Sequence, residues 1–467
     1  MQSGLGVDIG SSIISDIGLA DDTALLSDSI HKLACLLHLT VEYCQKYHVE
    51  LVAEKTKLLV FSPKNHGTGN YLQEVITPLI LNGHEIGFSS SAEHVGILRS
   101  VDGNMPNILS RLSAHTKAIM SILPTGMAKG HRGNPAASLR LDKLYGTPVL
   151  LSGLAALVLR DSELAAVHHH HKLNLQQLQR LCQDTPECVV MFLAGSLPAT
   201  AILHLRMFSL LGMIARLGPE NILHQHGTHT LLSATNKTII SSSWFLSLRP
   251  LCHKYGLQDP LLLLQSPLGK EKWKKLCKSK VIDFWEQKLR AEASLLPSLH
   301  FFNASFMSLS NPHPIWLHAR SPFEVGKAVI VARMLSGRYK TDRLTRHWSS
   351  DNPDGLCRLP DCLNQEGNLQ HILLHCPALA DARVKMISFW SAFLVSRPAL
   401  FPVVEHYTMK ADHLLPQFLL DPSCLPLVIS TNQAHPNTLQ DCLFISRTWC
   451  YAVHLARSKL IRAMNIS

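Results

Sequence analysis

Two adjacent carboxylates near the start of the chain, Asp21 and Asp22, are bracketed by apolar residues on both sides. The run from Ile17 to Leu26 therefore predicts a strand, a two-residue tip and a second strand, with both carboxylates at the tip. Side chains alternate between the faces of a strand, so one carboxylate can point at a ligand while its neighbour supports it. Such a tip suits Mg²⁺, which takes one or two protein carboxylates and completes its shell with substrate phosphates. A solvated Asp-Asp turn is the alternative for the dipeptide taken alone.

The elements expected after this tip are a helix, a charged strand and a tight hairpin. Apolar residues fall at helical spacing from Ile30 to Cys44, and a Ser-Asp-Ser run before them offers N-caps. A short strand with a charged entry is expected over Glu54–Phe61. Asn82-Gly83 is a strong hairpin turn signal, and the return strand reaches a Val-Gly-Ile step that ends at Ile97.

This order resembles the palm of reverse transcriptases, and more narrowly the RNA-directed DNA polymerase of non-LTR (LINE-type) retrotransposons. The family's aromatic-Ala-Asp-Asp tip and the Leu-Leu-Ser after it are similar to Leu19–Asp22 and Leu25–Ser27. Its Lys-Thr-Lys strand resembles Lys55–Lys57, and its Tyr-Leu-Gly grip resembles His94–Gly96. The resemblance implies metal ligation by Asp21 and Asp22, contact of Lys55 or Lys57 with the phosphates of the incoming nucleotide, and contact of Val95-Gly96 with the primer strand.

Two departures from the family pattern affect the expected activity. Leu19 replaces the usual aromatic residue, which changes packing under the primer terminus but removes no ligand. The family also needs a fingers subdomain and another Asp on an earlier strand, whereas only twenty residues precede Asp21. Asp8 and Asp16 lie there, but Val7–Gly10 resembles a family strand just before the tip, so neither is expected to replace that ligand. An incomplete carboxylate set cannot position both metal ions, which predicts a truncated polymerase that is inactive as this chain.

The composition indicates a globular chain, and the distribution of charge favours a polyanionic partner. The 467 residues are 46% hydrophobic and 17% charged, enough for several domains with their own cores. The net charge is +10, but residues 1–100 carry −5, so the remainder carries +15. A basic body favours nucleic acid, and the resemblance implies an RNA template or an RNA/DNA duplex.

The cysteines and the apolar runs bear on location. Twelve cysteines without the spacing of a small disulfide scaffold indicate reduced thiols inside a cell, in the nucleus or the cytoplasm. No signal peptide is apparent. The longest apolar run, Gly146–Leu159, is too short to span a bilayer, so a soluble chain without a membrane partner is expected.

The middle of the chain, from Met105 to about Leu299, has mostly helical patterns. Its first third is basic, as the thumb of a polymerase would be, and Lys117 and Arg132 are candidate phosphate contacts. A solvated helix face is the alternative. A run of four histidines, residues 168–171, is expected to be incidental, because neighbouring residues on a helix point about 100° apart and cannot bind one metal together.

A lysine-rich run covers residues 270–280, with six lysines, one Glu and Trp273. Lys274 and Lys275 are candidate phosphate contacts, and Trp273 could stack on a base. A solvated amphipathic helix with Trp273, Leu276 and Ile282 facing inward explains the run as well.

A cysteine–histidine cluster has the spacing Cys357-x4-Cys362-x8-His371-x4-Cys376. Three thiolates and an imidazole supply the closed tetrahedral shell typical of structural Zn²⁺. Pro360-Asp361 is expected to form the knuckle turn, and His371 and Cys376 to lie near opposite ends of one helical turn. His375 competes as a ligand, but its position next to Cys376 would strain the chelate.

This cluster and the segment from Ala332 to Tyr339 before it also resemble the C-terminal zinc knuckle of LINE-type reverse transcriptases. The predicted fold class is α+β, a partial palm followed by a mostly helical thumb and C-terminal region with a small zinc knuckle. Three functions stay open: a polymerase remnant, a non-catalytic nucleic-acid-binding protein, and a fragment of an element without function. The expected segments are a palm half (1–100), a thumb (101–180), a helical region (181–345), the knuckle (346–385) and a helical tail (386–467).

Overall fold

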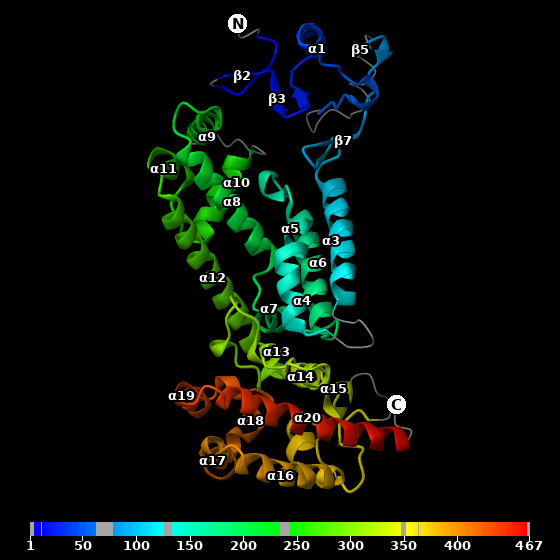
Figure 1. Cartoon of the computed structure of the whole chain (residues 1–467), viewed down its shortest axis with the longest axis vertical. Coiled ribbons are helices and arrows are strands. Elements are labelled where there is room, and N and C mark those ends of the chain that lie inside the picture. Colours follow the sequence, from blue (N-terminus) through cyan, green and yellow to red (C-terminus); the bar gives the residue numbers. More distant parts are fainter. Residues whose placement is uncertain are drawn as a thin grey trace. The chain divides into compact units, whose positions relative to one another are not determined.

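The computed structural model describes residues 4–10, 12–61, 78–125, 133–233, 243–346, 352–362 and 364–464. Helices dominate, and all the named strands lie in the first hundred residues, where they form small antiparallel pairs (Figure 1). The predicted α+β class is thus confirmed at this coarse level. Its interpretation as a polymerase palm stays a prediction.

Two compact units emerge from the pattern of close contacts. Unit 1 comprises residues 1–116, 148–168 and 200–281, and unit 2 comprises residues 117–147, 169–199 and 282–467. Each unit therefore gathers segments that are far apart in the sequence. The five consecutive segments expected from the sequence follow a different division and stay a prediction.

The strands of unit 1 form four hairpin-like pairs. In the second pair Leu19 lies opposite Asp22, so the loop is Ala20-Asp21, one residue earlier than the predicted Asp21-Asp22 tip. Pairing up to Asp22 leaves a loop of two residues, the commonest hairpin length, and Ala20 takes a left-handed φ of 54° to close it. The pairs are β1 (Val7–Asp8) with β2 (Ile13–Ile14), β3 (Asp16–Leu19) with β4 (Asp22–Leu25), β5 (Ile80–Leu81) with β6 (His84–Glu85), and β7 (Ser91–His94) with β8 (Ile97–Ser100).

The predicted helix and Asn-Gly turn are confirmed. Helix α1 (Ile30–Lys46) begins after Ser29, whose side chain accepts a hydrogen bond from the Lys32 amide. Asn82 and Gly83 have φ of 49° and 79°, as a tight hairpin turn between β5 and β6 requires.

The strand expected over Glu54–Phe61 is wrong for most of its length. Residues Ala53–Lys55 form a 3-10 turn (η1), and only Leu58 makes a ladder contact, a parallel bridge to Phe88. Thr56 bonds back to the Val52 carbonyl with both its amide, at 3.2 Å, and its hydroxyl, at 2.9 Å. These local bonds compete with strand pairing, which explains the difference.

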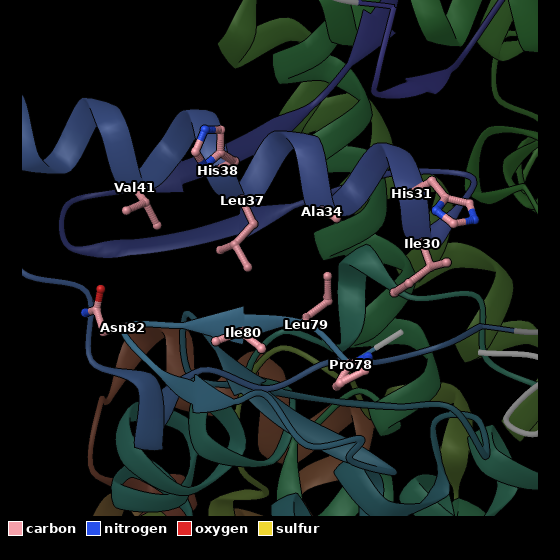
Figure 2. Close-up of a pocket in the computed structure, with 10 residues that line it drawn as sticks. All are labelled: Ile30, His31, Ala34, Leu37, His38, Val41, Pro78, Leu79, Ile80 and Asn82. Atoms are coloured by element: carbon pink, nitrogen blue, oxygen red, sulfur yellow. The ribbon is translucent and has the colours of Figure 1, made fainter. Parts of the chain in front are cut away.

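The apolar core of the first hundred residues lies between α1 and the β5–β6 hairpin. Leu37 on α1 and Leu79 and Leu81 beside or on β5 are buried together with Leu58 and Ile86. Figure 2 shows the apolar face of α1 directed at Pro78–Ile80. The residues on the two sides line a pocket of about 220 Å³. The helix is therefore held to the hairpin by side-chain burial.

Helices make up most of the chain after residue 100, and α3, α6 and α12 each contribute residues to both units. Up to residue 294 the elements are α3 (Met105–Thr125), α4 (Pro135–Leu141), the π turn η3 (Asp142–Gly146), α5 (Thr147–Leu150), η4 (Leu154–Ala156), α6 (Asp161–Gln179), α7 (Glu187–Ala194), α8 (Ala199–Arg216), α9 (Ile222–Ser233), α10 (Trp244–Lys254), α11 (Pro260–Gln265) and α12 (Lys270–Ser294).

The C-terminal part of unit 2 is built from short helices and turns around one long helix, α20. Its elements are η5 (Pro297–Leu299), η6 (Ala304–Phe306), α13 (Pro314–Leu317), α14 (Pro322–Leu335), α15 (Asp342–Thr345), the π turn η8 (His371–His375), η9 (Pro377–Leu379), α16 (Ala380–Val395), η10 (Pro398–Leu400), α17 (Phe401–Glu405), η11 (His406–Lys410), η12 (Asp412–Leu414), α18 (Leu415–Leu420), η13 (Pro422–Cys424), α19 (Pro426–Ala434) and α20 (Thr438–Ala463).

Helix α20 is the centre of this part of unit 2. It packs against α14, α16, α18 and α19, and Arg447, Cys450 and Val453 on it are almost fully buried. The tail whose role the sequence left open is thus a principal part of the core around the predicted knuckle.

One described helix, α8, is long and apolar enough to cross a membrane by length and composition. Within its apolar window, 61% of the residues are buried inside the protein. The core helix of a water-soluble protein passes the same test, so this is weak evidence for a membrane span.

Candidate metal centre

Cys357, Cys362, His371 and Cys376 come together in unit 2 as the sequence predicts. One ligand atom from each residue lies within 4.8 Å of the others, and the four residues are 9%, 6%, 5% and 0% exposed. His375 is exposed and stands outside the cluster, which supports the choice of His371 as the ligand. The closed set of four buried donors could hold a Zn²⁺ ion.

The first half of the cluster is fixed by a short two-stranded contact and a tight turn. Leu356 bridges Glu366, and the Cys357 amide donates to the Gln365 carbonyl at 2.8 Å. The turn at Pro360-Asp361 brings the chain back, with Asp361 at a φ of 61°. The predicted knuckle turn is therefore confirmed.

The second half lies on a π turn over His371–His375. The Cys376 amide donates to the His371 carbonyl at 2.7 Å, which closes the turn between residues five apart. A π turn of this kind places the first and sixth residues near each other along its axis, as the His-x4-Cys spacing requires. The sequence predicted the proximity, and the structure supplies its geometry.

The thiols of this cluster affect one another's ionisation. The Cys376 thiol donates a hydrogen bond that, against the effect of burial, lowers the pKa of Cys357 to about 5. The pKa of Cys376 is raised by its bond to Cys357, and burial raises the pKa of Cys362. Without a cation the three sulfurs thus favour a single thiolate. A Zn²⁺ ion would allow all three to ionise, since the thiolate is the metal-binding form.

The imidazole of His371 also fits a metal ligand. Its Nε2 is buried and makes no hydrogen bond within the described residues. A buried polar atom without a partner is costly, and a metal ion would satisfy it. The donor set and this atom together could hold a zinc ion in a closed site, in which all four positions are filled by protein.

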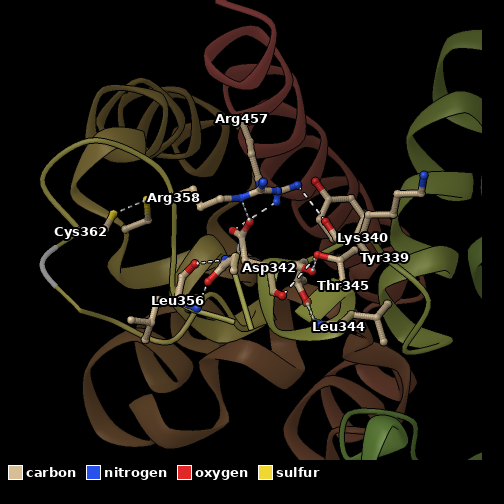
Figure 3. Close-up of polar contacts among 12 residues, drawn as sticks. Tyr339, Lys340, Asp342, Leu344, Thr345, Leu356, Arg358, Cys362 and Arg457 are labelled. Carbon is tan, nitrogen blue, oxygen red and sulfur yellow. Dashed lines mark hydrogen bonds and ion pairs between the residues drawn. The ribbon is translucent and has the colours of Figure 1, made fainter. Parts of the chain in front are cut away.

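Polar contacts from Asp342 and α20 support the centre from outside. Asp342 pairs with Arg358 and with Arg457 of α20, at 3.0 and 3.6 Å (Figure 3). Trp449, also on α20, donates from Nε1 to the Leu373 carbonyl inside the π turn at 3.3 Å. The C-terminal helix therefore holds both halves of the cluster. No sequence signal pointed to this contribution.

The Asp21–Asp22 hairpin is exposed, and neither side chain has an ion-pair partner among the described residues. Asp8 instead accepts from the Gly10 amide, at 2.7 Å, and Asp16 from the Ser15 hydroxyl, at 2.8 Å. Within the part of the chain that the structure describes, the Cys357 cluster is the one group of three or more candidate ligands. Among the described residues, the predicted Mg²⁺ site therefore consists of the two carboxylates of Asp21 and Asp22 alone.

The other residues predicted at the polymerase site occupy exposed positions in unit 1. Lys55 ends the η1 turn, and Lys57 follows it. Val95 and Gly96 form the loop between β7 and β8 with φ of 53° and 68°, and Arg111 donates a hydrogen bond to the Gly96 carbonyl.

The remaining candidate phosphate contacts lie on helices or outside the described part. Lys117 is exposed on α3, and Arg132 lies outside the described residues. Lys274 and Lys275 belong to the basic stretch of α12 and are exposed together with Lys270, Lys272, Lys278 and Lys280.

Trp273 faces the interior of unit 1 instead of the solvent. It is 2% exposed, and its Nε1 donates to the Phe208 carbonyl at 2.7 Å. Cys277, one turn further along, is also buried. The amphipathic interpretation of this run is thus correct for Trp273, and base stacking by its indole is excluded in this conformation.

The four-histidine run lies on α6, and its members differ in environment. His168 bonds through Nδ1 to the Thr200 hydroxyl at 3.1 Å, His169 is exposed and His171 is buried. They form no metal-binding group among the described residues.

No family model, curated protein or solved structure matches the chain.

Proposed function

We propose that this chain binds nucleic acid through sequence-independent contacts with phosphates, on a fold related to LINE-type reverse transcriptases. The observation that carries the proposal is the lysine face of α12, defined as Lys270, Lys272, Lys274, Lys275, Lys278 and Lys280. All six are exposed, and Glu271 is the one acidic residue among them. A rigid row of cations favours a polyanion.

The geometry of the lysine face suits a nucleic-acid backbone. A helix rises about 1.5 Å per residue, so the face is about 15 Å long. Duplex nucleic acid presents a charge about every 1.7 Å of its axis, so several phosphates fall within that length. Because Trp273 is buried, no aromatic ring of this face is available for base stacking. Contacts to phosphates position a protein but carry no sequence information, so an RNA template and an RNA/DNA duplex are both suitable partners.

Removal of charge from the lysine face tests the proposal. The variant with Lys272, Lys275 and Lys278 changed to Gln should bind a fluorescent RNA/DNA duplex more weakly. The slope of log K against log salt concentration should become less steep by about 2–3, because each phosphate contact contributes about 0.9 to the slope. The control changes Lys143, Lys385 and Lys459 to Gln, three exposed lysines elsewhere. Both variants lose the same net charge, so equal weakening in both would contradict a specific role of α12.

A metal-binding palm of the reverse-transcriptase type is a second proposal, favoured by the exposed Asp21–Asp22 hairpin. The hairpin is followed by α1, a tight Asn82-Gly83 turn and the Val95-Gly96 loop, in the order of a polymerase palm. In this proposal Asp21 and Asp22 hold Mg²⁺. A two-metal site needs a further carboxylate, so we infer that the described residues do not polymerise DNA by themselves.

A primer-extension assay with Mg²⁺ separates these candidates. The wild-type chain should incorporate no more nucleotide than the variant with Asp21 and Asp22 changed to Asn, while both bind the primer–template equally. Robust incorporation that disappears in the Asn variant would establish the polymerase instead.

A further inference from the structure

Arg383, near the start of α16, lies beside the cysteine cluster. Its Nη2 donates to the Cys376 carbonyl at 2.7 Å, and its Nη1 is buried without a hydrogen-bond partner in the part of the chain that the structure describes. Among the described residues no carboxylate forms an ion pair with it. A buried or half-buried cation needs a counter-charge, because its desolvation is otherwise uncompensated.

The cluster itself offers that counter-charge. The favourable electrostatic interactions of the Arg383 guanidinium are with Cys376 and Cys362. Zn²⁺ held by three thiolates and a neutral imidazole carries one net negative charge. Arg358, the residue after Cys357, is already paired with Asp342 at 3.0 Å. Arg383 is therefore a cation available to balance the centre.

We propose that Arg383 is a positioning residue of the metal centre, which compensates its net negative charge and fixes the Cys376 backbone. The proposal rests on occupancy of the cluster by zinc. Residues that surround metal ligands typically change metal affinity about 10- to 100-fold when they are mutated. Loss of the guanidinium should thus weaken zinc binding while all four ligands remain.

The test measures transfer of zinc from the full-length, zinc-loaded chain to a chromophoric chelator. Arg383→Gln should release zinc about 10- to 100-fold faster than the wild type. Arg383→Lys keeps the charge and should restore most of the retention. Lys385→Gln is the matched control, since Lys385 is exposed on the same helix and its change removes the same charge. It should release zinc at the wild-type rate.

If Arg383→Gln releases zinc at the wild-type rate, or if Lys385→Gln speeds zinc release equally, Arg383 does not have the proposed role. Release from folded Arg383→Lys as fast as from Arg383→Gln would overturn charge compensation. If circular dichroism shows that Arg383→Gln does not fold, Arg383→Lys decides, by retaining zinc as the wild type does or losing it. A zinc-free wild-type chain with intact thiols would instead overturn the zinc centre itself.

A spectroscopic measurement checks that the ligands are unchanged. With Co²⁺ in place of zinc, Arg383→Gln should keep the tetrahedral d–d bands and the thiolate-to-cobalt charge-transfer intensity of three sulfurs. A reduced charge-transfer intensity would show that a thiolate ligand is lost, and so would contradict an outer role for Arg383.

Discussion

The carboxylate of Asp342 accepts a hydrogen bond from Arg358 at 3.0 Å, and its other oxygen lies 3.6 Å from Arg457. Arg358 directly follows the zinc-ligand candidate Cys357, whereas Arg457 lies on α20, almost a hundred residues later. The Asp342 side chain is 4% exposed. One buried carboxylate therefore joins the start of the knuckle to the C-terminal helix.

Asp342→Asn should destabilise unit 2, because it leaves two partly buried guanidinium groups without their counter-charge. Breaking such a buried pair costs about 3–5 kcal/mol, and the partial exposure of Arg358 places the expected loss nearer 2 kcal/mol. Urea unfolding of the zinc-loaded chain measures it. Glu366→Gln is the control, since its ion pair with Arg343 is about half exposed and should contribute less than about 1 kcal/mol. Equal losses in both variants would contradict the role of Asp342.

Metal content provides a second prediction. The purified chain should contain about one zinc per molecule, because the described residues hold one closed four-ligand set. Cys362→Ala should lose it, whereas His375→Ala should retain it, since His375 is exposed outside the cluster. Elemental analysis and a thiol count measure this. Zinc retention by Cys362→Ala would exclude the proposed ligand set.

Local sequence patterns predicted the hairpins and the cysteine–histidine cluster, but they did not predict contacts between residues far apart in the sequence. Asn82-Gly83 specifies its turn through backbone preference, and three cysteines and a histidine within twenty residues predict a cluster that could hold a metal through their chemistry. The pairing of Asp342 with Arg457 leaves no such pattern, because its partners are more than a hundred residues apart.

Ambiguous patterns were resolved by neighbours that the sequence does not identify. The spacing of apolar residues in α12 allowed Trp273 either to face inward or to stack on a base. The hydrogen bond from its indole to the Phe208 carbonyl shows that it faces inward. At Glu54–Phe61 the apolar residues fit a strand, but the bonds from Thr56 to Val52 favour a turn. A polymerase interpretation of Asp21-Asp22 depends likewise on residues that must approach it in space.

A third prediction concerns pH and the buried His204, which bonds to the Tyr255 hydroxyl at 2.8 Å. Burial, together with the charge of Lys254, lowers the pKa of His204 from 6.5 to about 4. Well above pH 6.5 the imidazole is neutral in both the folded and the unfolded chain, so stability is unaffected. Between pH 6.5 and 4 only the unfolded chain binds the proton, so stability falls with falling pH, by roughly 3 kcal/mol at most.

Urea midpoints of the wild type and of His204→Gln, measured from pH 7 to pH 4, isolate this contribution. The variant should lose less stability than the wild type over that range. His253→Gln, a change at an exposed histidine, should follow the wild type. Parallel curves for the wild type and His204→Gln would exclude a depressed pKa at His204.

A fourth prediction tests how α12 is seated. A methyl group added at Gly212 would lie 2.3 Å from Cδ1 and 2.5 Å from Nε1 of Trp273. Gly212→Ala should therefore displace the indole, weaken its bond to Phe208 and destabilise unit 1 by about 1–3 kcal/mol. Tryptophan fluorescence and thermal unfolding measure this. Gly326→Ala, at a helical glycine where the added methyl meets no described atom within 4 Å apart from its chain neighbours and its own helix backbone, should be neutral or stabilising.

The last prediction concerns the strained loop between β7 and β8. Val95 has a φ of 53°, a conformation that disfavours β-branched residues in particular, and its side chain is 43% exposed. Val95→Asn should relieve the strain at little loss of buried surface, because Asn adopts left-handed conformations readily, and should stabilise the hairpin by about 1 kcal/mol. The control, Val52→Asn, changes a similarly exposed valine whose φ is −90°, where no strain exists to relieve. Unfolding midpoints that rise for Val95→Asn alone would establish the strain, and equal or lower midpoints would refute it.

If the loop contacts a primer strand, as the palm interpretation implies, the stabilised variant should also bind the primer–template differently from the wild type.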